Sequence, residues 1–218
     1  MTVLSNIKAV LWDNDGILVD SEILFYELTR EYFAKLGLEL TPDTWSLNYL
    51  GEGIGSREIA LSLGGDPDKI DPILDARNKE YRVVLRKPPP IQPGVWETLN
   101  VLDGRVKLGL VTGCHRDQLH LTHDHNGILG RFEIIVTADE CRVTKPDPEP
   151  YTRAVEGLGL QPEECLAIED SKRGLHAALA AGVHCIAVPT ALTAIQDFTG
   201  ALAVEKNVMA ILKHLAID

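Results

Sequence analysis

The 218-residue sequence has only four cysteines, and no apolar run approaches the ~18 residues that a membrane-spanning helix needs. The cysteines are widely and irregularly spaced and form no CxxC pair, which argues against a zinc ribbon or a disulfide framework. The amino terminus has no basic segment followed by a long apolar one, because Asp13 and Asp15 interrupt the first apolar stretch. We therefore expect a cytoplasmic protein without a membrane partner. The four cysteines are Cys114, Cys141, Cys165 and Cys185.

Basic residues are also scarce, with 21 Lys and Arg against 32 Asp and Glu, so the formal net charge is −11. This balance argues against nucleic acid and anionic membranes as partners, since either would require a basic surface. The same negative charge would repel a phosphorylated ligand, so a site for one needs cations of its own. The composition, 45% hydrophobic and 24% charged, is that of an ordinary globular protein. We expect a monomer or a weak homodimer.

A short apolar run at residues 9–12 predicts a buried parallel strand, and it ends in Asp13-Asn14-Asp15-Gly16. Residues i and i+2 of a strand point the same way, so Asp13 and Asp15 approach one site at the strand's carboxyl end. Two carboxylates this close repel each other unless they share a cation or a proton, or have different roles. Mg²⁺ suits such a pair, because it prefers oxygen ligands. The alternative is a polar Asp-Gly turn that simply ends the strand.

The order of the expected elements predicts an α/β fold. Residues 21–86 show helical patterns and no strand signal, whereas helix and strand alternate from residue 93 onward. Such alternation is typical of a doubly wound, Rossmann-like parallel sheet. We therefore expect a core domain formed by residues 1–18 and 89–218, with an all-helical cap domain inserted at 19–88. The proline-rich segment 87–94 would be one hinge between them.

The patterns predict helices and strands within these limits. Ser21 is the expected N-cap of the first helix, and residues 205–215 are expected to form a terminal helix. Expected helices cover 21–36, a stretch opened by 41–43, 56–63, 67–86, 95–102, 116–126, 148–157, 173–181 and 205–215. Expected strands cover 9–12, 106–112, 134–136, 165–168 and 184–188.

Three more groups of polar residues follow later core strands. Thr112, Gly113 and Cys114 end one strand, where a hydroxyl and turn amides can donate to a phosphate oxygen, although Thr-Gly turns are also common structural features. Glu169 and Asp170 end another, where they are candidate metal ligands or an acidic helix start.

Lys145 lies in a proline-stiffened turn, Lys145-Pro146-Asp147-Pro148. A fixed ammonium group beside the aspartate pair would reduce their repulsion and bind a phosphoryl group. The alternative is an ordinary surface lysine next to a helix start, since Asp147 and Pro148 suit an N-cap and a first helical position.

The segment from Asp13 to Ser21, DNDGILVDS, resembles the first motif (DxDGxLxDS) of the haloacid-dehalogenase-like hydrolases. The match is strongest to the phosphatase and β-phosphoglucomutase branch, which has a small helical cap. The segments around Thr112, Lys145 (KPxPxxY) and Asp170 resemble the second, third and fourth motifs, in the expected order.

The resemblance implies roles for the matching residues. Asp13 would be the nucleophile and Asp15 the general acid and base. Mg²⁺ would be held by Asp13, the main-chain carbonyl of Asp15, and Asp170, with Glu169 as a further ligand or beside the ligands. Thr112 and Lys145 would stabilise charge on the phosphoryl group, and Gly113 and Cys114 would contact the substrate.

Two arginines of the expected cap, Arg57 and Arg77, are candidates for substrate binding. In relatives of the β-phosphoglucomutase type, basic residues at comparable cap positions meet the distal part of the substrate. Either arginine can instead be a solvated side chain, and this alternative is stronger for Arg77, on a helix that reads as exposed.

Two positions depart from the family pattern. Phe25 stands where mutase-like members often carry a histidine, and Asn14 stands where an apolar residue is more usual. The first departure favours hydrolysis, and the side chain of Asn14 should point away from the metal. The histidines at 115, 120, 123 and 125 are expected to lie on a solvated helix face.

These features predict a Mg²⁺-dependent phosphatase that hydrolyses a small phosphorylated metabolite, of sugar-phosphate or phosphoglycolate type, through an aspartyl-phosphate. A β-phosphoglucomutase-like mutase is one alternative. A phosphate-accepting signalling module is another, although it would have no helical insert and would carry its acceptor aspartate on a later strand.

Overall fold

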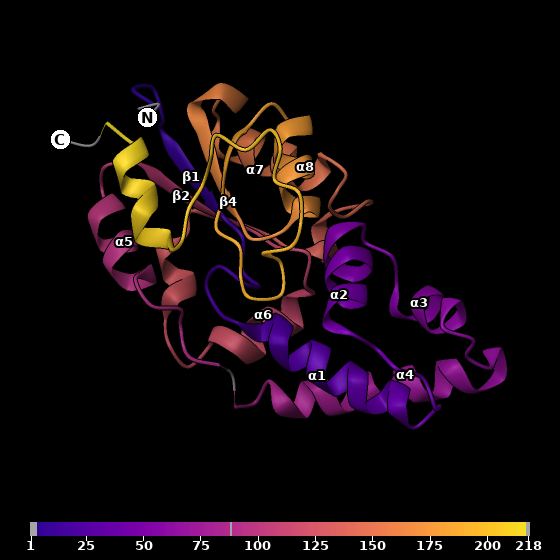
Figure 1. Ribbon diagram of the computed structural model, residues 1–218. Coiled ribbons are helices and arrows are strands. Elements are labelled where there is room, and N and C mark those ends of the chain that lie inside the picture. The colour runs from indigo at the N-terminus through magenta and orange to yellow at the C-terminus, as the bar shows by residue number, and fades with distance from the viewer. Residues whose placement is uncertain (1–3, 88, 217–218) are drawn as a thin grey trace.

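The computed structural model describes residues 4–87 and 89–216, and its core is one parallel sheet. The strand order is β3-β2-β1-β4-β5-β6, so the first strand lies near the middle of the sheet (Figure 1). This arrangement confirms the predicted α/β fold. The strands are β1 (Ala9–Trp12), β2 (Lys107–Val111), β3 (Ile134–Val136), β4 (Cys165–Glu169), β5 (His184–Ala187) and β6 (Ala203–Val204).

Side chains of β1 alternate between the two faces of the sheet, as the pleat requires. Val10 and Trp12 join one apolar cluster with α5 (Val95–Leu102) and the C-terminal 3₁₀ helix η5 (Val208–His214). Ala9 and Leu11 join a second cluster with α7 (Glu149–Leu158) and α8 (Lys172–Ala180). Both faces are therefore covered by helices, and this explains why the strands are apolar without alternation.

Between β1 and α5, residues 21–84 form helices joined by short turns and loops, and this part of the chain projects from the carboxyl side of the sheet (Figure 1). Its members are α1 (Ser21–Ala34), α2 (Pro42–Thr44), a π-helical turn η1 (Trp45–Gly51), α3 (Ser56–Ser62) and α4 (Pro67–Val84). They enclose apolar clusters of their own, centred on Trp45 and Tyr81. No helix in the described ranges is both long and apolar enough to cross a membrane.

The chain leaves the core and returns to it along two neighbouring segments. Val19 forms an antiparallel bridge to Ile91, and the N–H of Gln92 donates to the carbonyl of Leu18 at 2.8 Å. Pro88, at the predicted limit of the cap, is outside the described residues. The structure thus places both connections between helical insert and core side by side.

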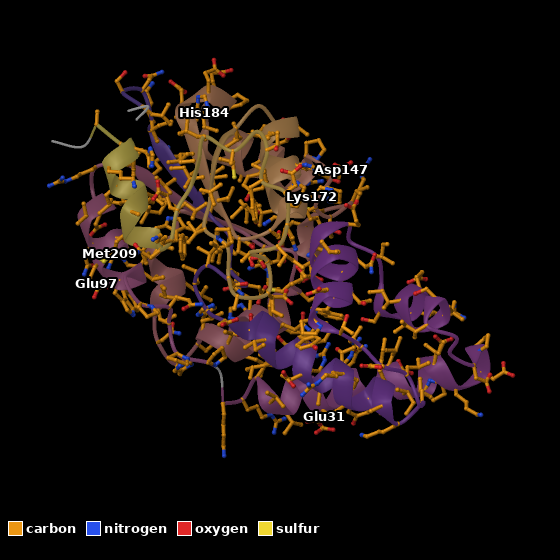
Figure 2. The ribbon with its side chains drawn as sticks, in the orientation of Figure 1. Glu31, Glu97, Asp147, Lys172, His184 and Met209 are labelled. Atoms are coloured by element: carbon orange, nitrogen blue, oxygen red, sulfur yellow. The ribbon has the colours of Figure 1, made fainter. Side chains whose placement is uncertain are left out.

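Polar contacts also join the insert to the core away from these connections. Gln196 of the core donates to the carbonyl of Ser46 at 2.7 Å. Lys172, which Figure 2 shows on the core beside the insert, pairs with Glu52 at 2.6 Å. The helical insert is therefore held against the carboxyl ends of the strands.

The remaining helices are α6 (Arg116–His123) and the 3₁₀ helices η2 (Ile128–Arg131), η3 (Ala138–Glu140) and η4 (Pro162–Glu164).

The structure differs from the sequence predictions at a few places. Ser21 is not the N-cap of α1 but its first residue, because its hydroxyl bonds to Asp15 instead of to the helix. The expected terminal helix at 205–215 is shorter and is a 3₁₀ helix, and β6 had no strand signal.

Candidate active site

A cavity of about 540 Å³ lies between the carboxyl ends of the strands and the helical insert. His184, at the amino end of β5, marks the opposite edge of the sheet, far from the insert (Figure 2). The core contributes Asp13, Asp15, Lys145 and Asp170 to the cavity wall. The insert contributes aromatic and basic side chains, namely Phe25, Tyr49, Arg77, Tyr81 and Arg82.

Lys145 is buried at the base of the cavity and links two acids. Its ammonium group lies 2.9 Å from Asp13 Oδ1 and 2.6 Å from Glu169 Oε1, and it also donates to the carbonyl of Val111 at 2.8 Å. Burial alone would lower the pKa of Lys145, but the charges of Asp13 and Glu169 outweigh burial and raise it. Lys145 is therefore a permanent cation beside the first aspartate, as the family motif implies.

Asp15 is held by hydroxyl groups. Ser21 donates to its Oδ1, and Thr112 lies 3.4 Å from its Oδ2. Burial, and next the charge of Asp13, raise the pKa of the Asp15 carboxyl. A carboxyl group with a raised pKa retains its proton more readily than a free aspartate, which suits a proton donor.

Two glycines let the acidic groups pack closely. Gly16 has φ of +86°, and a Cβ there would overlap the Asp170 carboxyl group. A Cβ at Gly174, in the first turn of α8, would overlap the Glu169 carboxyl group. The glycine after Asp15 is thus required both by its backbone conformation and by the space that Asp170 occupies.

Asp13, Glu169 and Asp170 form an acidic cluster. One carboxylate oxygen of each lies within 4.8 Å of the others, and all three residues are buried. Burial and the neighbouring charge of Asp13 raise the pKa of Glu169 to about 7 and that of Asp170 well above its usual value. Glu169 Oε2 is buried without a partner. An oxygen-only cluster with excess negative charge fits a hard divalent cation such as Mg²⁺.

The residues predicted to contact the substrate divide into two groups. Gly113, Cys114 and Arg77 line the cavity, whereas Arg57 does not, because it is exposed and pairs with Asp71 at 2.9 Å. The preference for Arg57 over Arg77 on the sequence is therefore reversed by the geometry. Thr112 is buried behind the cavity wall, and its hydroxyl accepts a hydrogen bond from Cys114 N–H at 3.1 Å.

Arg77 is buried, although the sequence pattern predicts an exposed helix at this position. Its Nη1 donates to Thr29 Oγ1 at 2.8 Å and to Ser56 Oγ at 3.0 Å. The guanidinium lies 4.3 Å from the centre of the Phe25 ring, so the residue in the position of the family histidine supports an arginine instead. Burial lowers the pKa of Arg77 without removing its charge.

Glu22 is a cavity residue that the sequence patterns did not single out. Its Oε2 is buried without a hydrogen-bond partner, and burial and the charge of Asp15 raise the pKa of Glu22 to about 8. Because Glu22 directly follows the Asp-Ser pair, the sequence pattern predicts that it is exposed in the first turn of a helix. Its only sequence signal is that it faces the same side of the helix as Phe25, three residues later.

One of the four histidines contradicts the prediction of a solvated face. His123 is fully buried, and its Nε2 lies 2.6 Å from Asn14 Oδ1. The side chain of Asn14 therefore points toward α6, as expected, rather than into the acidic cluster. The other three histidines are exposed.

Comparison with known proteins agrees with this geometry. The family model described as "Haloacid dehalogenase-like hydrolase" matches residues 10–188. The protein CbbY of Rhodobacter capsulatus is 31% identical over 206 residues, which cover 89% of this chain and 91% of CbbY. The phosphorylated carbohydrates phosphatase of Thermotoga maritima is 31% identical over 183 residues, covering 82% of this chain and 83% of the relative.

A solved structure shows the same fold. The crystal structure of CbbY from Rhodobacter sphaeroides in complex with phosphate superposes with a TM-score of 0.75, at 24% identity, and covers 94% of this chain and 96% of that one. The match extends over the sheet and the helical insert together. The chain is an enzyme that belongs to the haloacid dehalogenase-like hydrolases, in their phosphatase and β-phosphoglucomutase branch.

Proposed function

We propose that the protein is a Mg²⁺-dependent phosphatase that hydrolyses a small phosphorylated metabolite through an aspartyl-phosphate on Asp13. The observation that carries the proposal is the group of Asp13, Lys145 and Asp170 at the base of one cavity, with Asp15 beside them. Named relatives support the substrate class, since one is a phosphatase of phosphorylated carbohydrates.

Asp13 is the proposed nucleophile. A carboxylate oxygen attacks phosphorus, and the bond from phosphorus to the ester oxygen breaks, which divides one difficult displacement into two steps. Lys145 orients Asp13 through its 2.9 Å contact. Water then attacks the aspartyl-phosphate, releases inorganic phosphate and restores the Asp13 carboxylate.

Asp15 is the proposed general acid and base. Its raised pKa lets it carry a proton to the leaving ester oxygen in the first step. The resulting carboxylate takes a proton from the attacking water in the second step. Ser21 and Thr112 fix the carboxyl group during both transfers.

The acidic cluster of Asp13, Glu169 and Asp170 would hold the divalent cation, together with the main-chain carbonyl of Asp15. When bound, Mg²⁺ supplies positive charge that stabilises the phosphoryl oxygens. Glu169 Oε1 is already bonded to Lys145 at 2.6 Å and to Tyr151 at 2.5 Å, so it positions Lys145 whether or not its other oxygen reaches the ion.

The insert closes the cavity above this group, and we propose that residues 19–88 are the cap that sets specificity. A cavity of about 540 Å³ suits a small metabolite. Arg77 and Arg173 add positive charge to its wall, which offsets the net charge of −11 at the place where a phosphate ester would bind.

The test is release of inorganic phosphate from a panel of small phosphate esters, measured with Mg²⁺ and with EDTA. The variants are Asp13→Asn and a matched control, Asp75→Asn, which makes the same chemical change at an exposed position of α4. We expect turnover only with Mg²⁺, its loss in Asp13→Asn, and no change in Asp75→Asn.

Other outcomes decide against the proposal. Conversion of β-glucose 1-phosphate to the 6-phosphate without phosphate release would favour the mutase. Full activity of Asp13→Asn would show that Asp13 is not the nucleophile. Full activity in EDTA would show that the reaction does not need a divalent cation.

A further inference from the structure

The loop between β5 and β6, residues 188–202, extends from the sheet toward the helical insert (Figure 1). Leu192 of this loop is buried in the apolar cluster of the insert, together with Trp45 and Leu50. Thr193, the next residue, has no exposed surface, and Gln196 is 8% exposed. The loop is therefore a part of the core that packs into the insert, although the two are distant in sequence.

Gln196 joins the insert to the segment that carries Asp170. Its Nε2 donates to the carbonyl of Ser46, in the insert, at 2.7 Å, and its Oε1 accepts from the N–H of Lys172 at 2.7 Å. A carbonyl can only accept and an N–H can only donate, so both partners require the same orientation of the amide. Lys172 is the first residue of α8 and follows Asp170 by two positions. One buried side chain thus spans the boundary between insert and core, next to a member of the acidic cluster.

Thr193 extends this link to Asp170 itself. Its hydroxyl donates to Asp170 Oδ2 at 3.5 Å. The Thr193 oxygen accepts from the N–H of Thr190 at 2.9 Å, and the Thr193 N–H donates back to the Thr190 hydroxyl at 3.3 Å. The two hydroxyl oxygens lie 3.2 Å apart. These bonds close residues 190–193 into a turn that fixes the Thr193 hydroxyl beside Asp170.

We infer that Thr193 and Gln196 are positioning residues that couple the docking of the insert to the cation site. The inference rests on the proposed function, in which Asp170 helps to hold Mg²⁺. Thr193 orients the Asp170 carboxyl group, and groups that orient a metal ligand contribute to affinity without touching the ion. Leu192 and Gln196 tie the turn of Thr193 to the insert. Such coupling is reciprocal, so a docked insert strengthens Mg²⁺ binding and bound Mg²⁺ stabilises the docked insert.

Titration of Mg²⁺ into the metal-free protein, followed by calorimetry without any substrate, measures the first half of this coupling. Thr193→Val keeps the shape of the side chain but removes its hydroxyl, and we expect it to raise the Kd for Mg²⁺ about tenfold. Gln196→Met keeps the length of the side chain but breaks the link to the insert, and we expect it to raise the Kd about fivefold. Thr152→Val and Glu52→Gln are the matched controls, and they should keep the Kd of the wild type.

The controls make comparable changes away from the turn. Thr152 is exposed on α7, and Glu52 is an exposed residue of the insert whose pair with Lys172 is another polar contact between insert and core. Urea unfolding in EDTA shows that each variant is folded before the titration. An unchanged Kd in both Thr193→Val and Gln196→Met would overturn the inference and leave the proposed function intact. A wild type that binds no Mg²⁺ would refute the cation of the proposed function, and the inference with it.

Hydrogen exchange measures the second half of the coupling, first on the unmodified protein. The backbone amides of η1, which includes Ser46, should exchange more slowly with Mg²⁺ than in EDTA, because the bound ion stabilises the docked insert. Gln196→Met should abolish this slowing even when the variant is saturated with Mg²⁺. If Gln196 were merely structural, its replacement would speed the exchange of η1 equally with and without Mg²⁺. That result, or an exchange rate in the wild type that does not respond to Mg²⁺, would overturn the coupling.

Discussion

Replacing Glu22 by glutamine should stabilise the metal-free protein at neutral pH, although it removes an ionisable residue from the cavity. The Glu22 carboxyl group has a buried oxygen without a partner, and its pKa is raised from 4.5 to about 8. The folded state therefore binds this proton more tightly than the unfolded state. The contribution of Glu22 to stability is most favourable below pH 4.5 and is lost as the pH rises to 8.

The size of the effect follows from the two pKa values. Each pH unit between 4.5 and 8 costs about 1.4 kcal/mol, so Glu22 lowers the free energy of unfolding by about 3 kcal/mol at pH 7. At pH 5 the loss is below about 1 kcal/mol. Glutamine keeps the shape of the protonated acid and does not ionise, so Glu22→Gln should gain stability over the wild type as the pH rises.

Urea unfolding in EDTA at pH 5 and pH 7, followed by tryptophan fluorescence, measures this gain. The midpoint of the variant should move upward between the two pH values relative to the wild type, with an unchanged slope. Glu52→Gln is the control, because Lys172 lowers the pKa of this exposed carboxyl group, and its replacement should bring no gain. If the variant and the wild type differed in midpoint by the same amount at both pH values, or if the variant were less stable at pH 7, Glu22 would not be a buried carboxyl group with a raised pKa.

Two more predictions concern the buried cations. Lys145→Met leaves Asp13 and Glu169 buried without their cation. It should therefore abolish turnover and lower the free energy of unfolding, measured in urea, by about 3–5 kcal/mol. A variant with the stability of the wild type would contradict this prediction. Arg77→Leu should raise KM about tenfold for the best substrate, equivalent to about 1.4 kcal/mol of binding, whereas Arg57→Leu should leave KM unchanged. The opposite result would show that the cap presents Arg57 to the substrate.

Much of the core could be predicted from the sequence because its strands are buried on both faces. Residues 9–12 and 134–136 are strands with the predicted limits, since a short apolar run has few other stable arrangements. Acids that follow parallel strands must meet at one edge of the sheet, so Asp13 and Asp170 come together although they are distant in sequence. The strand order confirms the α/β fold, and the family model confirms the family assignment.

Other features depend on packing that no local pattern records. Arg77 is buried because α4 turns that side toward Thr29 and Ser56, whereas Arg57 faces solvent. His123 has the residue spacing of an exposed face, but its partner Asn14 is 109 residues away. For Arg77 and His123 the helix was predicted correctly, and the error was in which side of the helix faces the interior.

The paired connections at Val19 and Ile91 make the helical insert a replaceable unit. Because the chain departs and returns at adjacent backbone positions, a different segment can be spliced between them without altering the order of the six strands. On the proposed function, in which the insert sets specificity, we expect that exchange of this segment between relatives changes substrate preference and leaves the residues at the strand ends in place. The two adjacent connections thus allow the helical insert to change in evolution while the residues at the strand ends stay the same.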